Sequence, residues 1–122
     1  MPILEIEIVT AAEEALEADL AERLAAAAGA ALGAPPGRTW VRLRELPRTR
    51  YAEDGAAREE AVRPVFVSLL LADPPAGADR GAALAALTAA IAGACRRPVE
   101  NVHVLLLPAA RGRVAFGGEL LQ

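Results

Sequence analysis

The chain begins Met1-Pro2-Ile3-Leu4-Glu5-Ile6-Glu7-Ile8-Val9. Apolar side chains alternate with glutamates in this stretch, which predicts a β-strand with one buried face. A proline can occupy the first position of a strand without losing a hydrogen bond of the ladder. If Met1 is removed, Pro2 carries a free secondary amine. Two interpretations follow: Pro2 only begins the strand, or its amine has a pKa lowered by burial and transfers protons near neutral pH.

A helix and a second strand are expected next. Thr10 and Glu13 have the spacing of a capping box, which predicts that a helix begins at Thr10, and the Pro35-Pro36-Gly37 cluster ends it. Residues 39–46 alternate again, so Trp40, Arg42 and Arg44 should share the strand face that points away from the helix. A right-handed crossover makes the two strands parallel.

The same order of elements then recurs. After a polar connector over residues 47–63, residues 64–71 form an apolar strand, which we expect to be buried on both faces. Asp79 can cap a second helix that ends at Arg96-Arg97-Pro98, and residues 101–107 form the last strand. Cys95, at the helical spacing of the apolar residues, is expected in the core.

The two halves match at a spacing of about sixty residues. The matched positions are Pro2 and Pro64, Pro35 and Pro98, Trp40-Val41 and His103-Val104, and Gly55 and Gly118. The sequence therefore predicts one domain over residues 1–122, made of a first β-α-β unit (1–55) and a second one (64–122). Its fold class is α/β, more closely α+β: a four-stranded mixed sheet with two helices on one face. The bare face of such a sheet is expected to be buried by oligomerisation.

Composition excludes several classes of function. All 13 basic residues among the 122 are arginines, and the net charge of -3 argues against a nucleic-acid partner. One cysteine and one histidine rule out an internal disulfide and a metal site of several thiolates or histidines, and no cofactor is expected. No stretch is long and apolar enough to span a membrane, so a cytoplasmic protein is expected.

Together, these residues resemble the tautomerase superfamily, whose type member is 4-oxalocrotonate tautomerase. The resemblance rests on Met1-Pro2-Ile3 before a strand, on the duplicated unit, on residues 98–104, and on the terminal stretch from Gly112 to Leu120. It implies a fused, two-unit homotrimer in which Pro2 is the general acid or base for enol-keto proton transfer. The implied substrate is a small anionic 2-hydroxy or 2-keto unsaturated acid. Pro64 lies inside the chain and has an amide nitrogen, so one proline site per chain is implied.

Other members of the family hydrate, dehalogenate or decarboxylate such acids, and these reactions stay open, as does a trimeric binding or scaffold protein without catalysis. The arginines that bind carboxylate in the type member have no counterpart here. Their places are taken by Ala12 and Trp40 in the first half, and by Pro74 or Pro75 and His103 in the second.

Seven residues are therefore candidates for binding substrate beside Pro2. Arg42, Arg44 and Arg80 are either a displaced carboxylate clamp or ordinary surface charges. Tyr51 and Glu53 either donate a hydrogen bond and activate water or are loop residues. Trp40 and His103 occupy places of the family's site, although a lone histidine on a strand commonly has a structural role.

Overall fold

The computed structural model describes residues 1–54 and 62–122. Gly55, expected at the end of the first unit, and the connector residues Arg58, Glu59 and Glu60 lie outside the described residues. The regular elements are listed here in chain order: β1 (Ile3–Thr10), α1 (Leu20–Ala31), β2 (Trp40–Pro47), η1 (Arg48–Arg50), β3 (Val65–Leu70), α2 (Gly77–Cys95), η2 (Val99–Asn101), β4 (Val102–Leu106), β5 (Ala115–Phe116) and β6 (Glu119–Leu120).

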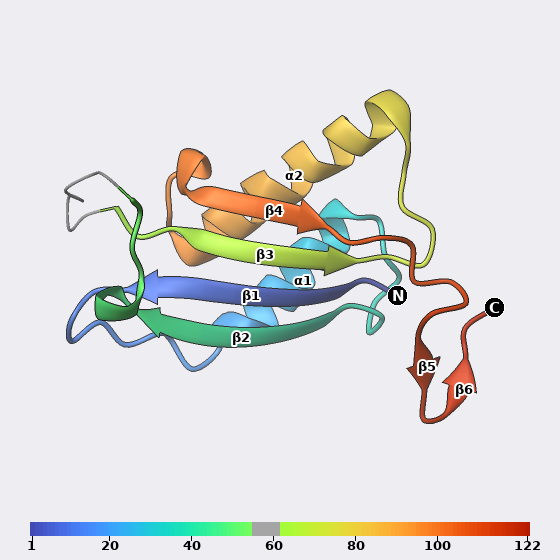
Figure 1. The fold of residues 1–122 in the computed structure, drawn as a ribbon, viewed down its shortest axis with the longest axis horizontal. Coiled ribbons are helices and arrows are strands. Elements are labelled where there is room, and N and C mark those ends of the chain that lie inside the picture. The colour runs from blue at the N-terminus through green and yellow to red at the C-terminus, as the bar shows by residue number, and fades with distance from the viewer. Residues whose placement is uncertain (55–61) are drawn as a thin grey trace.

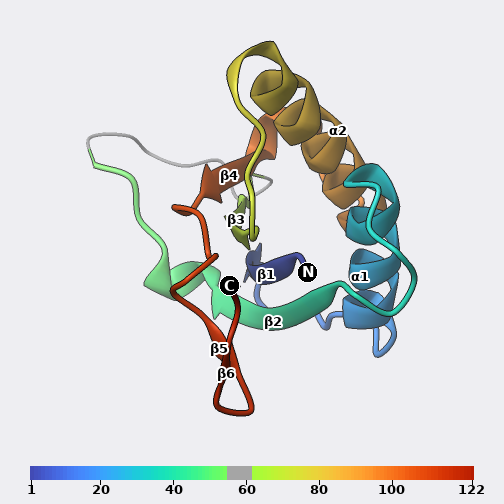
Figure 2. The same cartoon turned by 90° about the vertical axis from the view of Figure 1, so that its right-hand side faces the viewer.

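The sheet has the strand order β2-β1-β3-β4. Each unit contributes a parallel pair, β1 with β2 and β3 with β4, and the two units join through antiparallel β1 and β3. Figures 1 and 2 show α1 and α2 side by side on one face of this sheet. The predicted fold is confirmed: two β-α-β units form a four-stranded mixed sheet with both helices on one side.

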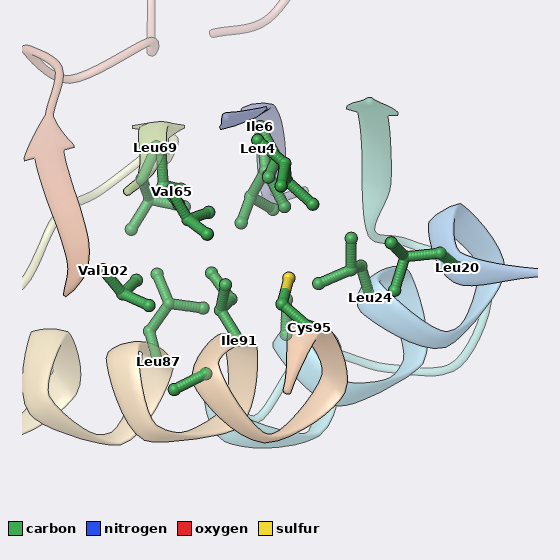
Figure 3. Close-up of a cluster of buried hydrophobic side chains, with 14 residues drawn as sticks. Leu4, Ile6, Leu20, Leu24, Val65, Leu69, Leu87, Ile91, Cys95 and Val102 are labelled. Atoms are coloured by element: carbon green, nitrogen blue, oxygen red, sulfur yellow. The ribbon is translucent and has the colours of Figure 1, made fainter. Parts of the chain in front are cut away.

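The core lies between the sheet and the two helices (Figure 3). Alternate residues of the two central strands point into it, so Leu4, Ile6 and Ile8 are buried while Glu5 and Glu7 are not. Leu24 of α1 and Ile91 of α2 meet them from the helical layer. Burial of branched aliphatic side chains, at about 25 cal/mol per Å² of apolar surface, stabilises this two-layer arrangement without aromatic residues. Cys95 is buried in the core as expected.

The first helix begins later than the sequence predicts. Thr10 is the buried last residue of β1, paired with Pro47, and α1 starts only at Leu20. Glu13 has a left-handed backbone (φ 66°), and the Glu14 carboxylate accepts a hydrogen bond from the backbone N–H of Ala11. The expected capping box is therefore wrong, because strand pairing holds Thr10 and the carboxylate bond comes from the next residue.

Two further details of the second unit differ from expectation. The helix α2 begins at Gly77 with Ala76 at the N-cap, so Asp79 lies in the first turn and does not cap the helix. Strand β3 alternates buried and half-buried residues in a single chain, so only its helix-facing side is fully buried. The opposite side of β3, which carries Phe66 and Ser68, belongs to the face of the sheet that the helices leave uncovered.

The C-terminal residues form a small hairpin of β5 and β6, which projects beside the start of β1 (Figure 1). Phe116 of this hairpin packs edge-on against Trp40, with 5.3 Å between ring centroids. Both ends of the chain therefore meet at one end of the sheet. Pro2 lies at this end.

Candidate functional site

Pro2 is buried at the edge of a cavity of about 480 Å³. The residue directly precedes β1, and its carbonyl accepts a hydrogen bond from the backbone N–H of Trp40 at 3.0 Å. The cavity is formed where the end of α1, the loop after β3 and the start of α2 meet: Ala31, Leu32, Ala34, Pro35, Leu71, Ala72, Asp73, Pro75, Asp79 and Ala83 line it together with Met1 and Pro2. The wall is mostly apolar, which is the surrounding that lowers the pKa of an amine.

The charged side chains of this wall are carboxylates. Asp73 and Asp79 line the cavity, and no arginine is among the described residues that do so. Arg111 lies against Asp73, with its Nε donating to Asp73 Oδ1 at 2.8 Å, and this ion pair lowers the pKa of the Asp73 carboxyl. Both partners are exposed to solvent. The cavity therefore has one ionised carboxylate, Asp73, whose charge is balanced by Arg111, and a second carboxylate at Asp79.

Among the three candidate arginines, Arg80 is the one that contacts a described residue of the cavity wall. Its Nε donates a hydrogen bond to the carbonyl of Pro75 at 2.8 Å, and Pro75 lines the cavity. This bond fixes the Nε atom of the exposed guanidinium against the loop that leads into α2. The remaining N–H groups of a guanidinium held in this way can still donate to an anion.

Arg42 and Arg44 lie on the uncovered face of the sheet, as predicted from the alternation of β2. Both form ion pairs with Glu5 of the adjacent strand, Arg44 at 4.0 Å. With Phe66 and Ser68 they border a separate, smaller cavity of about 150 Å³. Within one chain, these two arginines and the Pro2 cavity are therefore distinct places.

Trp40 contacts Pro2 through its backbone N–H, whereas its side chain lies outside the Pro2 cavity. Ile3 is its partner in the strand register, and its ring packs on Phe116 outside the residues that line the Pro2 cavity. The indole is 53% exposed. An exposed indole at this position is typical of an interface residue.

Tyr51, Glu53 and His103 belong to another group on the uncovered face. Phe66 connects them, since its ring lies 5.7 Å from that of Tyr51 and 5.6 Å from that of His103. The Tyr51 hydroxyl donates to Glu53 Oε2. Tyr51 follows the far end of β2, whereas Pro2 precedes the near end of β1, so one chain does not bring this group to the Pro2 cavity.

Three residues at the Pro2 cavity were not among the predicted site residues. The sequence predicts Asp79 as a helix cap and gives no expectation of a site role for Asp73 or Arg111. The signal for the first two was present, because both follow a strand whose end lies beside the start of an antiparallel neighbour. The pairing of Arg111 with Asp73 is a tertiary contact over 38 positions and has no signal in the sequence.

No helix within residues 1–54 and 62–122 is long and apolar enough to cross a membrane. In the same part of the chain, no three side chains of histidine, cysteine, aspartate or glutamate are grouped as metal ligands would be.

Comparison with known proteins identifies the fold. No protein-family model matches the sequence, and no curated protein matches it. Among solved structures, Pt0534 inactivated by 2-oxo-3-pentynoate superposes with a TM-score of 0.73 at 24% identity, over 98% of this chain and 95% of that chain. A wild-type fused 4-OT that forms a symmetric trimer gives a TM-score of 0.74 at 19% identity, over 98% and 94%. MIF2 from Leishmania major gives 0.67 at 18% identity, over 99% and 97%.

At these identities the likeness shows the fold, which is the one seen in fused 4-OT and MIF2. The chain matches nearly the whole length of each of these structures. The chemistry has to be argued from the residues of this chain.

Proposed function

We propose that this protein is a tautomerase in which the amine of Pro2, freed by removal of Met1, transfers a proton during enol-keto conversion of a small 2-hydroxy or 2-keto unsaturated acid. The observation that carries the proposal is the buried position of Pro2 beside a cavity of about 480 Å³. A cavity of this size matches a small-molecule site. The fold shared with fused 4-OT supports the same assignment.

The proton transfer needs one group that both accepts and donates. The neutral amine takes the proton from the enol oxygen, the O–H bond breaks, and a carbonyl forms. The resulting ammonium then gives a proton to the carbon at the other end of the conjugated system, so a C–H bond forms and the amine is neutral again. Apolar surroundings favour the neutral amine and a nearby carboxylate favours the ammonium, so both forms of the cycle have support in the wall. General acid-base catalysis of this kind is most efficient when the pKa lies near the working pH.

Arg80 is the residue that we propose as the ligand of the substrate carboxylate. It is anchored to Pro75 of the cavity wall, and its side chain carries no other described ion pair that would occupy its charge. Asp73 is paired with Arg111, but the Asp79 carboxylate repels an anion, so a cation at this rim favours binding of an anionic substrate. Arg42 and Arg44 are already paired with Glu5 in the single chain.

Chemical labelling tests whether Pro2 is a free amine. Pt0534 is inactivated by 2-oxo-3-pentynoate, and a neutral secondary amine can add to this conjugated alkyne. The nitrogen forms a bond to the alkyne carbon remote from the ketone, and the neighbouring carbon is protonated. We expect the mass to rise by one whole reagent per chain, with fragmentation placing the addition on Pro2.

The matched control is a variant with one alanine inserted between Met1 and Pro2. Its Pro2 nitrogen is an amide and cannot add to the alkyne, so Pro2 stays unlabelled. Pro64 also remains unlabelled in both proteins, because its nitrogen is an amide. A native protein that keeps Met1 in the cell, or takes up no reagent at Pro2, contradicts the proposal.

We further propose that the chain assembles as a homotrimer through the uncovered face of the sheet. This face presents Trp40 and Leu105, which are 53% and 61% exposed, beside the half-buried Phe66. Exposed apolar side chains on a sheet face are typical of a protein-protein interface. Fused 4-OT structures of this fold are trimers.

Light scattering after size exclusion is expected to give the mass of three chains. Leu105→Asp introduces a charge into the proposed interface and should shift the mass to that of one chain at micromolar concentration. Ala89→Asp, on the exposed side of α2, introduces the same charge away from the sheet and should leave the trimer intact. Equal behaviour of both variants would argue against this interface.

A further inference from the structure

The duplicated unit produces a second cavity at the opposite end of the sheet from Pro2. It has a volume of about 310 Å³ and lies between the end of α2 and the segment that connects β1 to α1. Its wall uses positions equivalent to those of the Pro2 cavity: Ala94 and Cys95 of α2 correspond to Ala31 and Leu32 at the end of the first helix. The two cavities are thus related by the internal repeat.

Their charges are opposite. The Pro2 cavity carries Asp73 and Asp79, whereas the second cavity is lined by four arginines and two glutamates: Arg23, Arg63, Arg96, Arg97, Glu14 and Glu17. Four guanidinium groups face these two carboxylates and that of Asp19, which pairs with Arg23 at 3.3 Å, so an excess of one positive charge remains. A concave surface with excess charge of one sign concentrates small ions of the other sign.

One of the four arginines is committed to the fold. The Arg97 side chain is only 8% exposed and donates to the carbonyls of Arg63 and Val9 and to the Glu14 carboxylate, all between 3.1 and 3.2 Å. The other three are less completely paired. The Nε atoms of Arg23 and Arg63 are buried and make no hydrogen bond in the described part of the chain, although Arg63 Nε lies 3.3 Å from Glu14 Oε1 in an ion pair. Buried donors normally have a hydrogen-bond partner, so Arg23 Nε indicates a missing one and Arg63 Nε an incompletely satisfied one.

Arg96 adds a second indication. It is the C-cap of α2 and has a left-handed backbone (φ 55°), a conformation in which glycine is favoured at the end of a helix. A larger residue in this conformation is strained, and such strain is common where a side chain is needed for binding. The Arg96 side chain is exposed at the rim of the cavity.

Glu17 shows what kind of group these arginines hold. Its carboxylate accepts two hydrogen bonds from Arg23, at 3.1 and 3.3 Å, and lies 4.0 Å from Arg96. The Glu17 side chain is 52% exposed, so it can rotate away into water. A free oxyanion can therefore take the place of this carboxylate between the same guanidinium groups.

Covalent chemistry is not expected in this cavity. Burial raises the pKa of the Cys95 thiol to about 11, so the thiol stays protonated at neutral pH and is a poor nucleophile. Pro64, the counterpart of Pro2, has an amide nitrogen and no basicity. The second cavity is suited to binding alone.

We propose that this arginine-lined cavity is a binding site for a small oxyanion with two negative charges, such as inorganic phosphate or a short dicarboxylate, held by Arg23, Arg63 and Arg96. The site is separate from the Pro2 cavity and does not depend on the function proposed for it. Phosphate and malonate serve as the probes, because they share the dianionic chemistry and differ in geometry.

Isothermal titration calorimetry of the assembled protein, at constant ionic strength set with chloride, is the direct test. We expect saturable binding of at least one of the two anions, with one site per chain. Removal of one charge-assisted hydrogen bond typically weakens binding by about tenfold or more, so Arg63→Gln should do so. Arg38→Gln removes the same charge from an exposed loop at the other end of the sheet and should leave the affinity within about twofold.

Two further variants separate binding from folding. Arg96→Gly should weaken anion binding by about tenfold while it raises the melting temperature, because glycine fits the left-handed backbone without strain. Glu17→Gln should tighten binding, since the competing carboxylate is gone. No saturable heat with either anion, or the same loss of affinity in Arg38→Gln as in Arg63→Gln, overturns the proposal.

Discussion

Replacing Pro2 with alanine is expected to lower kcat for ketonisation of phenylenolpyruvate or 2-hydroxymuconate by about two to four orders of magnitude, which is the usual contribution of a positioned general acid or base. The alanine variant keeps an amine at the chain terminus after removal of Met1. The pyrrolidine ring is lost, however, and with it the fixed position of the nitrogen beside the cavity. The measurement is the decay of enol absorbance under steady-state conditions.

Pro64→Ala is the matched control for this variant. Pro64 is the repeat counterpart of Pro2, is also buried, and also precedes a strand, but its nitrogen is an amide. Its replacement should leave kcat within about threefold once the folded fraction is accounted for. Equal turnover by the wild type and Pro2→Ala would falsify the proposed mechanism and favour a binding protein of the same fold.

The same assay distinguishes the role of Arg80. A residue that binds the substrate carboxylate equally in the ground state and the transition state affects KM more than kcat. Arg80→Gln is therefore expected to raise KM by about tenfold with little change in kcat, in contrast to the kcat effect at Pro2. An unchanged KM assigns the carboxylate contact to another arginine, and Arg42 or Arg44 of a neighbouring chain would then be the next residues to replace.

The fold could be predicted from the sequence because its determinants are local and are repeated. Alternation in residues 3–9 and 39–46 defines two strands with one buried face, and the same pattern in the second half leaves one arrangement of four strands and two helices. The start of α1 could not be predicted in this way. A capping box at Thr10 competes with strand pairing to Pro47, and only the tertiary structure decides between them.

The site was less predictable than the fold. Pro2 was a candidate because it follows Met1 at the chain terminus, and Arg80 because it lies at the start of the second helix, and both remain predictions. The separation of Tyr51, Glu53 and His103 from Pro2 depends on the direction of the strands in the sheet. The pairing of Arg42 with Glu5 depends on the register between β1 and β2. The arginine-lined cavity was missed because Arg23, Arg63 and Arg97 come from three distant segments that only the folded chain brings together.

Arg97→Met is expected to reduce the free energy of unfolding by about 3 kcal/mol, which is the usual cost of removing one partner of a buried ion pair. The guanidinium connects the end of β1, the residue before β3 and the Glu14 carboxylate, and its side chain is buried. Methionine retains much of the apolar stem but leaves two carbonyls and a carboxylate without this donor. Urea unfolding at pH 7 and one fixed protein concentration measures the change.

The decrease of stability at acidic pH tests the contribution of Glu14, the ion-pair partner of Arg97. Partial burial opposes ionisation of Glu14, but the N–H of Ala11 and the charges of Arg97 and Arg63 outweigh it, so the pKa of Glu14 is lowered from its ordinary value of 4.5. A carboxyl whose pKa is lower in the folded state stabilises the protein above the unfolded value and loses that contribution as the pH falls through the folded value. Stability should therefore decrease below about pH 4.5 less steeply in Glu14→Gln than in the wild type. Glu22→Gln, on the exposed side of α1, should keep the wild-type slope.

The double variant Arg97→Met with Glu14→Gln should lose less stability than the sum of the single variants, because each removes the same contact. Additive losses at pH 7 would mean that the ion pair contributes nothing and that Arg97 acts through its two carbonyl hydrogen bonds alone.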